Sequence, residues 1–552
     1  MSKRYSRQEL LGADLVWLFR LVYAGRVFRW SSRPISLLTE EGQQLQVDGG
    51  LDEVDFQESF SLLSYEPDPR SVSLELLFPV SVAELEALGH SLVDAEGELS
   101  LIRVGDDEAD RMALMRGLVR NPVWGSDDEL VSFTVQQPPW LDQGVFPPAN
   151  CVVNTTTWPY APTTSLGATY PWVFGVAFKY YEYTTGGYTT MWGITTSRAL
   201  LVDEADEDDG MGGTVHRMTF LLGYGNCKRM SLYETYDSGF PGYPRPTVVA
   251  NDYTYYLNLI GVADEIRVRY ANDALGQQVF LVDCVDDVRL EGVEGPWWTA
   301  VGAYYYPSQG STYAGTLARE VLSLGNVTID HQRWETVRPK MDELQVGGAI
   351  LEQVDPGQWV IDNLLPLLPI SLVSGPDGVY PIWWDPDAPA VASIVAGADV
   401  VRVSQVTAIR DVTDCYTEIY LDYVKDLKTG VYAERVTASA DPTTTSGATG
   451  WPTVYQRRRA TRQAPRSKGS TSDIIYTQEQ AAKVVSWQAR AFADPVYSVT
   501  YEVGLDWGWL EPGMCVELTD SDMRFDGLRC LVGTIDWGLN TIGITLTFQR
   551  QA

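Results

Sequence analysis

The sequence predicts a mainly β, multi-domain protein of the α+β type, with a few short helices and a β-rich insertion. Three observations lead to this prediction. The chain has 552 residues, more than one hydrophobic core usually organises. Apolar and polar residues alternate near both ends, which is typical of half-buried strands. Between Val152 and Asn326, aromatic residues are concentrated among Thr and Gly, a composition that suits strands and turns.

Residues 1–140 are predicted to form a β domain with short helices. The apolar stretches Val16–Tyr23 and Arg26–Trp30 flank an Ala-Gly pair, which predicts a hairpin. Strict alternation predicts further strands at Val72–Phe78 and Val131–Val135. Between them, Ser81 and Glu84 have the spacing of a capping box, so we expect a short helix that ends at Gly89.

Residues 141–327 are expected to form a separate β domain or an insertion into a larger fold. The acidic run Asp203–Asp209 lies beside glycines, which raises the question of a calcium site. An EF-hand loop has Gly at its sixth position and Glu at its twelfth. Counting from Gly210 places His216 at the twelfth position, so the match fails. A solvated charged loop is the expected structure, with calcium binding as the alternative.

Residues 328–436 are predicted to form a middle domain. Asp355 is suited to be the N-cap of a helix because Pro356 follows it at the first helical position. The turn Gly375–Gly378 separates two apolar stretches and predicts a hairpin. A further strand is expected at Glu418–Val424.

Residues 437–472 are rich in Thr, Ser, Gly and Arg without periodicity, which predicts a long flexible loop. The loop carries a dense basic cluster, which consists of Arg457, Arg458, Arg459, Arg462, Arg466 and Lys468. Contact with DNA is one interpretation of this cluster. A contact with an acidic neighbouring subunit is favoured, since the rest of the chain offers so much negative charge.

Residues 473–552 are predicted to form a helix and a small antiparallel barrel or sandwich packed on it. Thr477 and Gln480 form a second capping-box pattern, and the Asp494-Pro495 pair ends the helix. The expected strands are 497–503, 514–518, 528–535 and 541–548, with a turn at Asp526-Gly527.

The charge balance and the rare chemistry-bearing residues exclude several classes of function. With 41 basic and 73 acidic residues the net charge is −32, which excludes a nucleic-acid coat but is compatible with an acidic tunnel. The three histidines are His90, His216 and His331, far apart in sequence, and the six cysteines form no CxxC pair. No segment is long and apolar enough to span a membrane. We therefore expect no enzyme, no catalytic residue, no cofactor and no metal site.

The order of these pieces resembles the tail hub proteins of long-tailed bacteriophages, which are related to the baseplate hubs of contractile tails. The similar stretches are Trp509–Thr519, Gly527–Ile535 and Ile542–Thr547 at the end, Trp359–Pro369 and Gly375–Tyr380 in the middle, and Leu18–Phe28, Gly49–Leu51 and Tyr170–Gly175 towards the front. Each is a strand pattern with turn residues. Together they extend over about two-thirds of the chain.

The resemblance implies a homotrimer at the tail tip, in which each chain contributes two tube-like β-barrels, one near each end of the sequence. Three chains would then present a pseudo-sixfold ring to a hexameric tail tube or distal tail protein. The lumen would pass DNA without specific binding, together with the end of the tape measure protein. Tip or fibre proteins would attach outside, and the chain would be located in the virion after synthesis in the host cytoplasm.

The block between Val152 and Asn326 is not explained by a minimal hub, and no murein hydrolase domain is recognisable. One alternative function is therefore a receptor- or carbohydrate-binding protein of the tail tip, because aromatic faces stack on sugars and anchor interfaces. An enzyme that acts on cell-surface polysaccharide is a third hypothesis.

Overall fold

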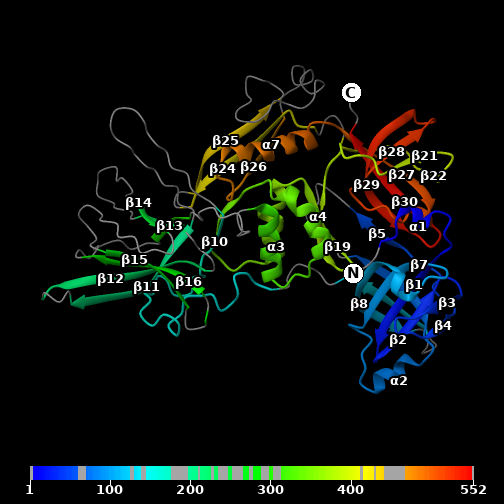
Figure 1. Ribbon diagram of the computed structural model, residues 1–552, viewed down its shortest axis with the longest axis horizontal. Helices are drawn as coiled ribbons and strands as arrows, with labels where there is room; N and C mark the ends of the chain where they lie inside the picture. The colour runs from blue at the N-terminus through cyan, green and yellow to red at the C-terminus, as the bar shows by residue number, and fades with distance from the viewer. Residues whose placement is uncertain are drawn as a thin grey trace.

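The computed structural model describes residues 4–59, 70–124, 130–137, 144–175, 197–208, 212–224, 229–233, 246–250, 265–272, 276, 278–286, 297–301, 313–410, 415–427, 430–439 and 466–549. Most described residues lie in strands and a minority in short helices, so the predicted mainly β fold class is confirmed. The molecule is elongated (Figure 1). Strands from both ends of the chain lie together at one end, helices lie in the middle, and further strands lie at the far end.

The N-terminal sheet has the order β2 (Arg26–Ser31), β1 (Leu15–Tyr23), β7 (Glu96–Arg103), β8 (Met112–Trp124), β9 (Leu130–Gln136) and β6 (Ser71–Leu77). The predicted first hairpin is β1–β2, and Ala24 and Gly25 in its turn have φ of 51° and 71°. Positive φ at both central residues is the backbone of a type I′ turn, which matches the twist of the strands. Along β6, exposed and buried residues alternate as the sequence predicts.

Short elements complete this region. They are α1 (Arg7–Leu10), the hairpin of β3 (Ile35–Leu38) and β4 (Gln44–Val47), α2 (Val82–Ala87) and the 3-10 turn η1 (Glu108–Asp110). The predicted helix after Ser81 is α2, since the Ser81 hydroxyl accepts a hydrogen bond from the backbone N–H of Glu84 at 3.3 Å. The chain leaves α2 at Gly89, whose φ is +88°.

The C-terminal sheet is assembled from three distant parts of the chain. Its order is β21 (Ala392–Val395), β28 (Cys515–Asp520), β29 (Phe525–Trp537), β30 (Thr541–Gln549), β27 (Val496–Gly504) and β22 (Val400–Val403), with β23 (Thr407–Arg410) also beside β27 and β5 (Phe56–Ser59) beside β29. The 3-10 turn η5 (Leu505–Trp507) follows β27. The turn expected at Asp526-Gly527 is wrong, because β28 and β29 are joined at residues 521–524 and both residues lie inside β29.

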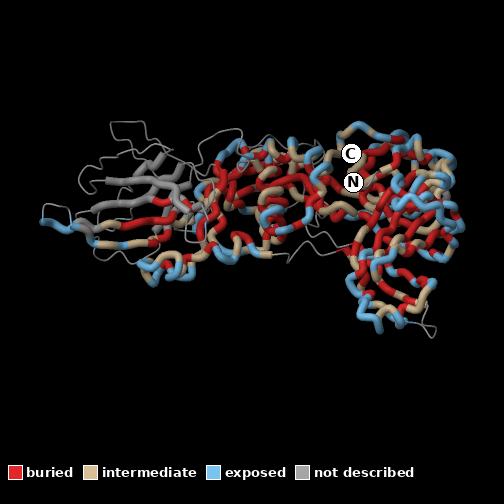
Figure 2. Tube along the Cα trace, turned by 60° about the horizontal axis from the view of Figure 1, so that its bottom comes forward, coloured by how far each residue is buried: buried red, intermediate tan, exposed pale blue. Residues whose placement is uncertain are grey.

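The N-terminal and C-terminal sheets share one hydrophobic core. The indole of Trp17 on β1 lies edge-on to Trp537 on β29, with ring centroids 5.7 Å apart, and edge-on to Phe56 on β5 at 6.1 Å. Phe56 and Trp537 are stacked at 5.8 Å. The Trp17 indole also donates a hydrogen bond to the carbonyl of Leu539 at 3.0 Å. Figure 2 shows buried residues in both sheets at this end of the molecule.

A second hydrophobic core, the middle core, is formed by helices and short sheets. It contains α3 (Ala314–Leu324), α4 (His331–Met341), β18 (Gly347–Ile350), α5 (Pro356–Asn363), η3 (Leu365–Leu367), the hairpin of β19 (Ile370–Gly375) and β20 (Gly378–Trp383), the sheet of β25 (Val431–Ser439), β24 (Glu418–Asp426) and β26 (Ser467–Thr471), and α7 (Gln478–Phe492). As predicted, Asp355 caps α5 by accepting from the Gln358 N–H at 2.6 Å. The hairpin about Gly375–Gly378 is confirmed as β19–β20.

Helix α7 forms where the capping residues predict it, and the Thr477 hydroxyl accepts from the Gln480 N–H. Its expected packing on the C-terminal strands is wrong. The buried face of α7, including Val484 and Val485, packs on β24 and β25 in the middle core. The inner face of the C-terminal sheet is already covered by the N-terminal sheet, so the helix covers another sheet.

The predicted loop at 437–472 differs from the structure at both ends. Residues 437–439 belong to β25, and residues 467–471 form β26, which pairs in parallel with β24. Residues 440–465 lie outside the described part of the chain.

The distal sheet lies at the other end of the molecule (Figure 1). Its strands are β10 (Trp172–Gly175), β11 (Ser197–Asp208), β12 (Thr214–Tyr224), β13 (Arg229–Tyr233), β14 (Pro246–Ala250), β15 (Glu265–Asn272), β16 (Gln278–Asp286) and β17 (Trp297–Val301), and β18 of the middle core pairs with β10 at the edge of this sheet. The acidic run from Asp203 was expected to be a loop, but Asp203–Asp208 belongs to β11 and pairs with β12. The hairpin satisfies its backbone hydrogen bonds and keeps Glu204 and Asp206 exposed to water.

We expect Trp537→Ala to destabilise both terminal sheets together. The substitution removes a fully buried indole from the shared core and leaves a cavity, which should cost about 3–5 kcal/mol of unfolding free energy. Amide hydrogen exchange should accelerate in β1 and in β30. The matched control is Trp124→Ala on β8, where the indole is 37% exposed and the expected change is about 0.5 kcal/mol or less. Faster exchange in β30 alone would contradict a shared core.

Candidate functional site

The described residues offer little for catalysis. No group of three or more His, Cys, Asp and Glu is placed to hold a metal ion in the described part of the chain. His90 follows α2, His216 lies on β12 and His331 begins α4, so the structure does not bring the histidines together. None of the described helices has the length and hydropathy of a membrane span.

The most elaborate polar site is a buried ionic cluster between the terminal sheets and the middle core. At its centre Glu58 on β5 has a side chain that is 2% exposed. One carboxylate oxygen accepts from Arg4 Nη2 at 2.8 Å and the other from Arg70 Nη1 at 2.7 Å. Arg70 also donates to the carbonyl of Leu114 on β8 at 3.2 Å. Glu58 therefore links the N-terminal segment and the N-terminal sheet to β5, which belongs to the C-terminal sheet.

The same cluster continues into the middle core. Arg4 Nε lies 3.1 Å from Glu511 Oε1, and Arg333 Nη2 of α4 lies 2.8 Å from the same oxygen. The Arg333 guanidinium also stacks over the ring of Tyr380 on β20, with its carbon 4.4 Å from the centroid. We call the five charged residues the junction cluster, which consists of Arg4, Glu58, Arg70, Arg333 and Glu511.

The electrostatics of the junction cluster favour ionised Glu58. Burial by itself would raise the pKa of Glu58, but the positive charges of Arg4 and Arg70 outweigh burial and lower this pKa below its usual value. An ion pair in a buried site costs desolvation of both charges, and removal of one partner leaves the other uncompensated. Within the junction cluster, the buried pair of Glu58 and Arg70 is therefore the most sensitive to the loss of one partner.

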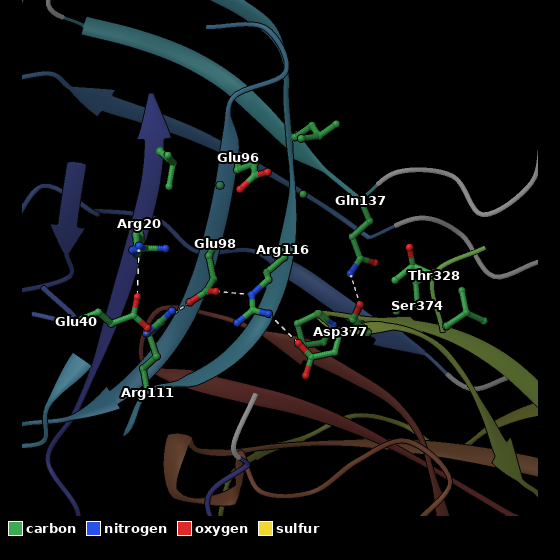
Figure 3. Close-up of a pocket in the computed structure, with 18 residues that line it drawn as sticks. Arg20, Glu40, Glu96, Glu98, Arg111, Arg116, Gln137, Thr328, Ser374 and Asp377 are labelled. Carbon is green, nitrogen blue, oxygen red and sulfur yellow. Dashed lines mark hydrogen bonds and ion pairs between the residues drawn. The ribbon is translucent and has the colours of Figure 1, made fainter. Parts of the chain in front are cut away.

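A cavity of about 720 Å³ lies between the N-terminal sheet and the turn of the β19–β20 hairpin. Figure 3 shows the charged residues that line it, contributed by β1, β7 and β8, by Arg111 just before β8, by Glu40 between β3 and β4, and by the hairpin turn. The hairpin also approaches residues 328–330 closely: a Cβ at Gly378, whose φ is +127°, would lie 2.7 Å from the carbonyl oxygen of Thr328. Glycine is therefore required at this turn.

Ion pairs cross the cavity wall in an unbroken series, which we call the cavity series. Its members are Arg20, Glu40, Arg111, Glu98, Arg116 and Asp377, each paired with the next. Arg111 Nη1 lies 2.6 Å from Glu40, and Arg116 Nη1 lies 2.7 Å from Asp377. The last pair joins β8 of the N-terminal sheet to the hairpin of the middle core. Beside it, Gln137 Nε2 donates to the carbonyl of Gly375 at 3.0 Å in a buried hydrogen bond.

The cavity series is suited to positioning and not to proton transfer. Burial would raise the pKa of Glu98, but its hydrogen bond from Arg111 and the charges of Arg111 and Arg116 lower it. A general acid at neutral pH needs a raised carboxyl pKa, so Glu98 is a poor donor. The arginines are permanently charged and are held by carboxylates. Through the Arg116–Asp377 pair, this arrangement links the N-terminal sheet to the hairpin of the middle core.

The basic cluster predicted from the sequence lies mostly outside the described residues. This applies to Arg457, Arg458, Arg459 and Arg462. Of the remaining two, Arg466 lies immediately before β26 with its guanidinium carbon 5.0 Å from the ring centroid of Tyr416. Lys468 lies in β26 with its ammonium 4.8 Å from the ring of Phe492. The role of the cluster in subunit contact stays a prediction.

Sequence reasoning missed both ionic groups. Glu58 and Glu511 are 453 positions apart in the sequence and occupy no recognisable motif. One usable signal was present, because Glu98 and Arg111 interrupt strand-like stretches with charges at positions that turn out to be buried. A charged residue is almost never buried unless it is paired.

Neither a protein-family model nor a curated protein sequence matches the chain. Among solved structures, the chain is similar to the 43 kDa tail protein of prophage MuSo2 from Shewanella oneidensis, with 9% identity, a TM-score of 0.38, and coverage of 96% of this chain and 98% of that one. A chain of the virion of a native gene transfer agent has 13% identity and a TM-score of 0.39, with 68% and 88% coverage. A prophage tail protein from Listeria monocytogenes EGD-e has 10% identity and a TM-score of 0.24, with 70% and 96% coverage. Similarity at this level does not define the function of the chain.

We expect Glu58→Gln to lower the unfolding free energy by about 3–5 kcal/mol at pH 7, because Arg4 and Arg70 lose their buried counter-charge. Since the pKa of Glu58 is lowered in the folded protein, the difference in unfolding free energy between wild type and the variant is fully present above the unfolded-state pKa of about 4.3. It disappears as the pH falls through the lower pKa of the folded state. Urea unfolding at several pH values from 7 to 3 measures this difference. Glu75→Gln, on the exposed face of β6, is the control and should change little. A difference that stays constant with pH would contradict the assignment.

We expect Asp377→Asn to loosen the β19–β20 hairpin without unfolding the protein. The pair with Arg116 is partly exposed, so its loss should cost about 1 kcal/mol or less. Amide exchange in the turn should then accelerate by up to about fivefold, with the terminal sheets unaffected. Asp526→Asn, an exposed carboxylate on β29, serves as the control. Unchanged exchange in the turn would show that the pair does not hold the hairpin.

Proposed function

We propose that the chain is a structural protein of a phage tail and acts as the trimeric hub of the tail tip. The observation that carries this proposal is the pairing of the two ends of the chain into two sheets that share one core. The resemblance of the sequence to tail hub proteins implies two tube-like barrels per chain. Three copies would then present six sheets to a hexameric tail tube or distal tail protein.

In this role the chain would join the tube to tip or fibre proteins and line part of the DNA conduit. A net charge of −32 supports a lumen that repels the phosphate backbone, so that DNA and the end of the tape measure protein pass without binding. The virion, at the tail tip or baseplate, would be the location of the protein. The junction cluster and the cavity series suit such a structural protein because they link the terminal sheets to the middle core within each chain.

A structural role is also supported by the chemistry of the described charges. Glu58 and Glu98 face arginines, whose positive charges lower the pKa of both carboxyl groups against the effect of burial. Carboxylates held in this way suit a structural role and not general acid–base catalysis.

The alternative of a receptor platform gains little support from the described aromatic residues. In the block between Val152 and Asn326, Tyr170, Trp172, Phe174 and Phe220 are buried, and Trp172 and Phe174 pack in the middle core. Tyr160 differs, since it is 73% exposed. Two further aromatic stretches of this block, at 179–183 and 303–306, lie outside the described residues.

The test of the proposal is the assembly state of the purified chain. Sedimentation velocity and electron microscopy should find a closed threefold ring, and a tail-tube hexamer should bind to one face of it. A chain that stays monomeric at high concentration and has no affinity for tube subunits would overturn the hub. Glycan binding by that monomer would favour the receptor alternative.

A further inference from the structure

The two terminal sheets and the middle core have separate hydrophobic cores. We call the N-terminal and C-terminal sheets the terminal body, and the elements of the middle core the middle body. Among the described residues, none belongs to both hydrophobic cores. The cavity of about 720 Å³, which we call the cleft, lies between the N-terminal sheet and the hairpin of the middle body, and charged residues line it. Two bodies that are not joined by one apolar core are expected to move relative to each other.

Three of the connections between the two bodies meet around Phe492, at the end of α7. The first joins β20 to β21 through residues 384–391, the second joins β23 to β24 between Arg410 and Tyr416, and the third joins α7 to β27 through residues 493–495. Members of all three connections line one cavity of about 140 Å³: Trp384, Pro386, Arg410, Phe492 and Val496. These connections therefore form a single hinge.

Direct contacts hold the three connections together at this hinge. The guanidinium carbon of Arg410 lies 5.2 Å from the ring centroid of Phe492. The backbone N–H of Tyr416 donates to the carbonyl of Phe492 at 3.2 Å, and the two rings lie edge-on at 6.4 Å. Asp387 in the first connection forms an ion pair with Arg490 in the last turn of α7. A rotation about this place would leave these local contacts in place.

The turn of the β19–β20 hairpin lies away from this hinge. Figure 1 shows α7 on the upper side of the molecule and β19 beside β8 on the lower side. Nearer to the hinge, Ile382 approaches the C-terminal sheet so closely that a Cβ at Gly513 would lie 2.2 Å from its Cγ2 atom. A fourth connection follows Gln137, and residues 138–143 lie outside the described part of the chain. A rotation about Phe492 would therefore displace the hairpin turn more than Ile382.

Polar contacts join the two bodies across their interface. Arg116 Nη1 lies 2.7 Å from Asp377, and the two side chains are 40% and 23% exposed. Arg333 Nη2 lies 2.8 Å from Glu511, and these side chains are 25% and 23% exposed. Ion pairs with this much solvent contact add little stability and are screened by salt. We call the Arg116–Asp377 and Arg333–Glu511 pairs the latch.

We propose that the terminal body and the middle body open about the hinge at Phe492, and that the latch keeps the cleft closed. Opening separates the hairpin turn from β8 and exposes the walls of the cleft, while each body keeps its own hydrophobic core. High salt favours the open arrangement, because the screening length falls to about 3 Å at 1 M and the latch pairs weaken. The hinge lies within one chain and does not depend on the hub assembly.

The experiment measures distances between nitroxide spin labels in the full chain by double electron–electron resonance. One label pair spans the cleft, at the exposed positions Glu75→Cys on β6 and Gln332→Cys on α4. A reference pair lies within the terminal body, at Glu75→Cys and at the exposed position Asp526→Cys on β29. The labelled chain is diluted with an excess of unlabelled chain, so that the distances arise within one chain in any assembly state. Labelling of the wild-type chain measures the background from native cysteines.

The double variant Asp377→Asn with Arg333→Gln removes both latch pairs. We expect a second, longer distance across the cleft, with a population about fivefold or more above that of wild type. Wild type at 1 M salt should change in the same direction, and the reference pair should keep its distance. The matched control is Arg319→Gln with Glu335→Gln, which removes a partly exposed ion pair inside the middle body and should leave both distances unchanged.

Three outcomes would overturn the proposal. The first is an unchanged distance across the cleft both in the latch variant and at 1 M salt. The second is equal broadening of the cleft pair and the reference pair, which would show that the terminal body itself loosens. The third is a longer cleft distance in the control variant, which would assign the change to a general loss of ion pairs and not to the latch.

Discussion

The shared core of the two terminal sheets is the constraint on which the rest of the structure depends. Trp17, Phe56 and Trp537 meet there at centroid distances of 5.7 to 6.1 Å, and they come from the first strand, a crossing strand and the penultimate strand. Burial of such large apolar side chains is the main favourable contribution to folding. Because each sheet covers the other, neither would keep its inner face dry alone.

The ionic groups add direction to this apolar contact. Hydrophobic burial is not directional, so a shared core by itself permits several angles between sheets. Glu58 accepts from two arginines in a site with almost no solvent contact, and the cavity series ties β8 to the hairpin of the middle core through Asp377. The buried pairs of Glu58 have a demanding geometry and are expensive to break, whereas the partly exposed Arg116–Asp377 pair contributes about 1 kcal/mol or less. Together they would hold three parts of the chain in one arrangement.

Local features were predictable in proportion to how local their causes are. The first hairpin follows from the Ala24-Gly25 turn, and α7 follows from Thr477 and an apolar stripe. The high charge of the acidic run from Asp203 favours a loop in the sequence. In the structure this run pairs with β12 and is therefore a strand. The Asp526-Gly527 dipeptide favours a turn in the sequence, but in the structure both residues lie inside β29. The junction cluster had no local signal, since Glu58 and Glu511 meet only after the sheets have paired.

The sequence by itself determined the fold class, the positions of several strands and of α2, α5 and α7, and the acidic character that excludes a nucleic-acid coat. These depend on periodicity, capping and charge, which act over a few residues or over the whole composition. Only the tertiary structure decided that β5 joins the C-terminal sheet, that α7 covers β24 and β25, and that arginines from three segments converge on two carboxylates. Those outcomes depend on which apolar faces remain uncovered after other faces have packed together. That in turn depends on contacts between segments that are far apart in the sequence.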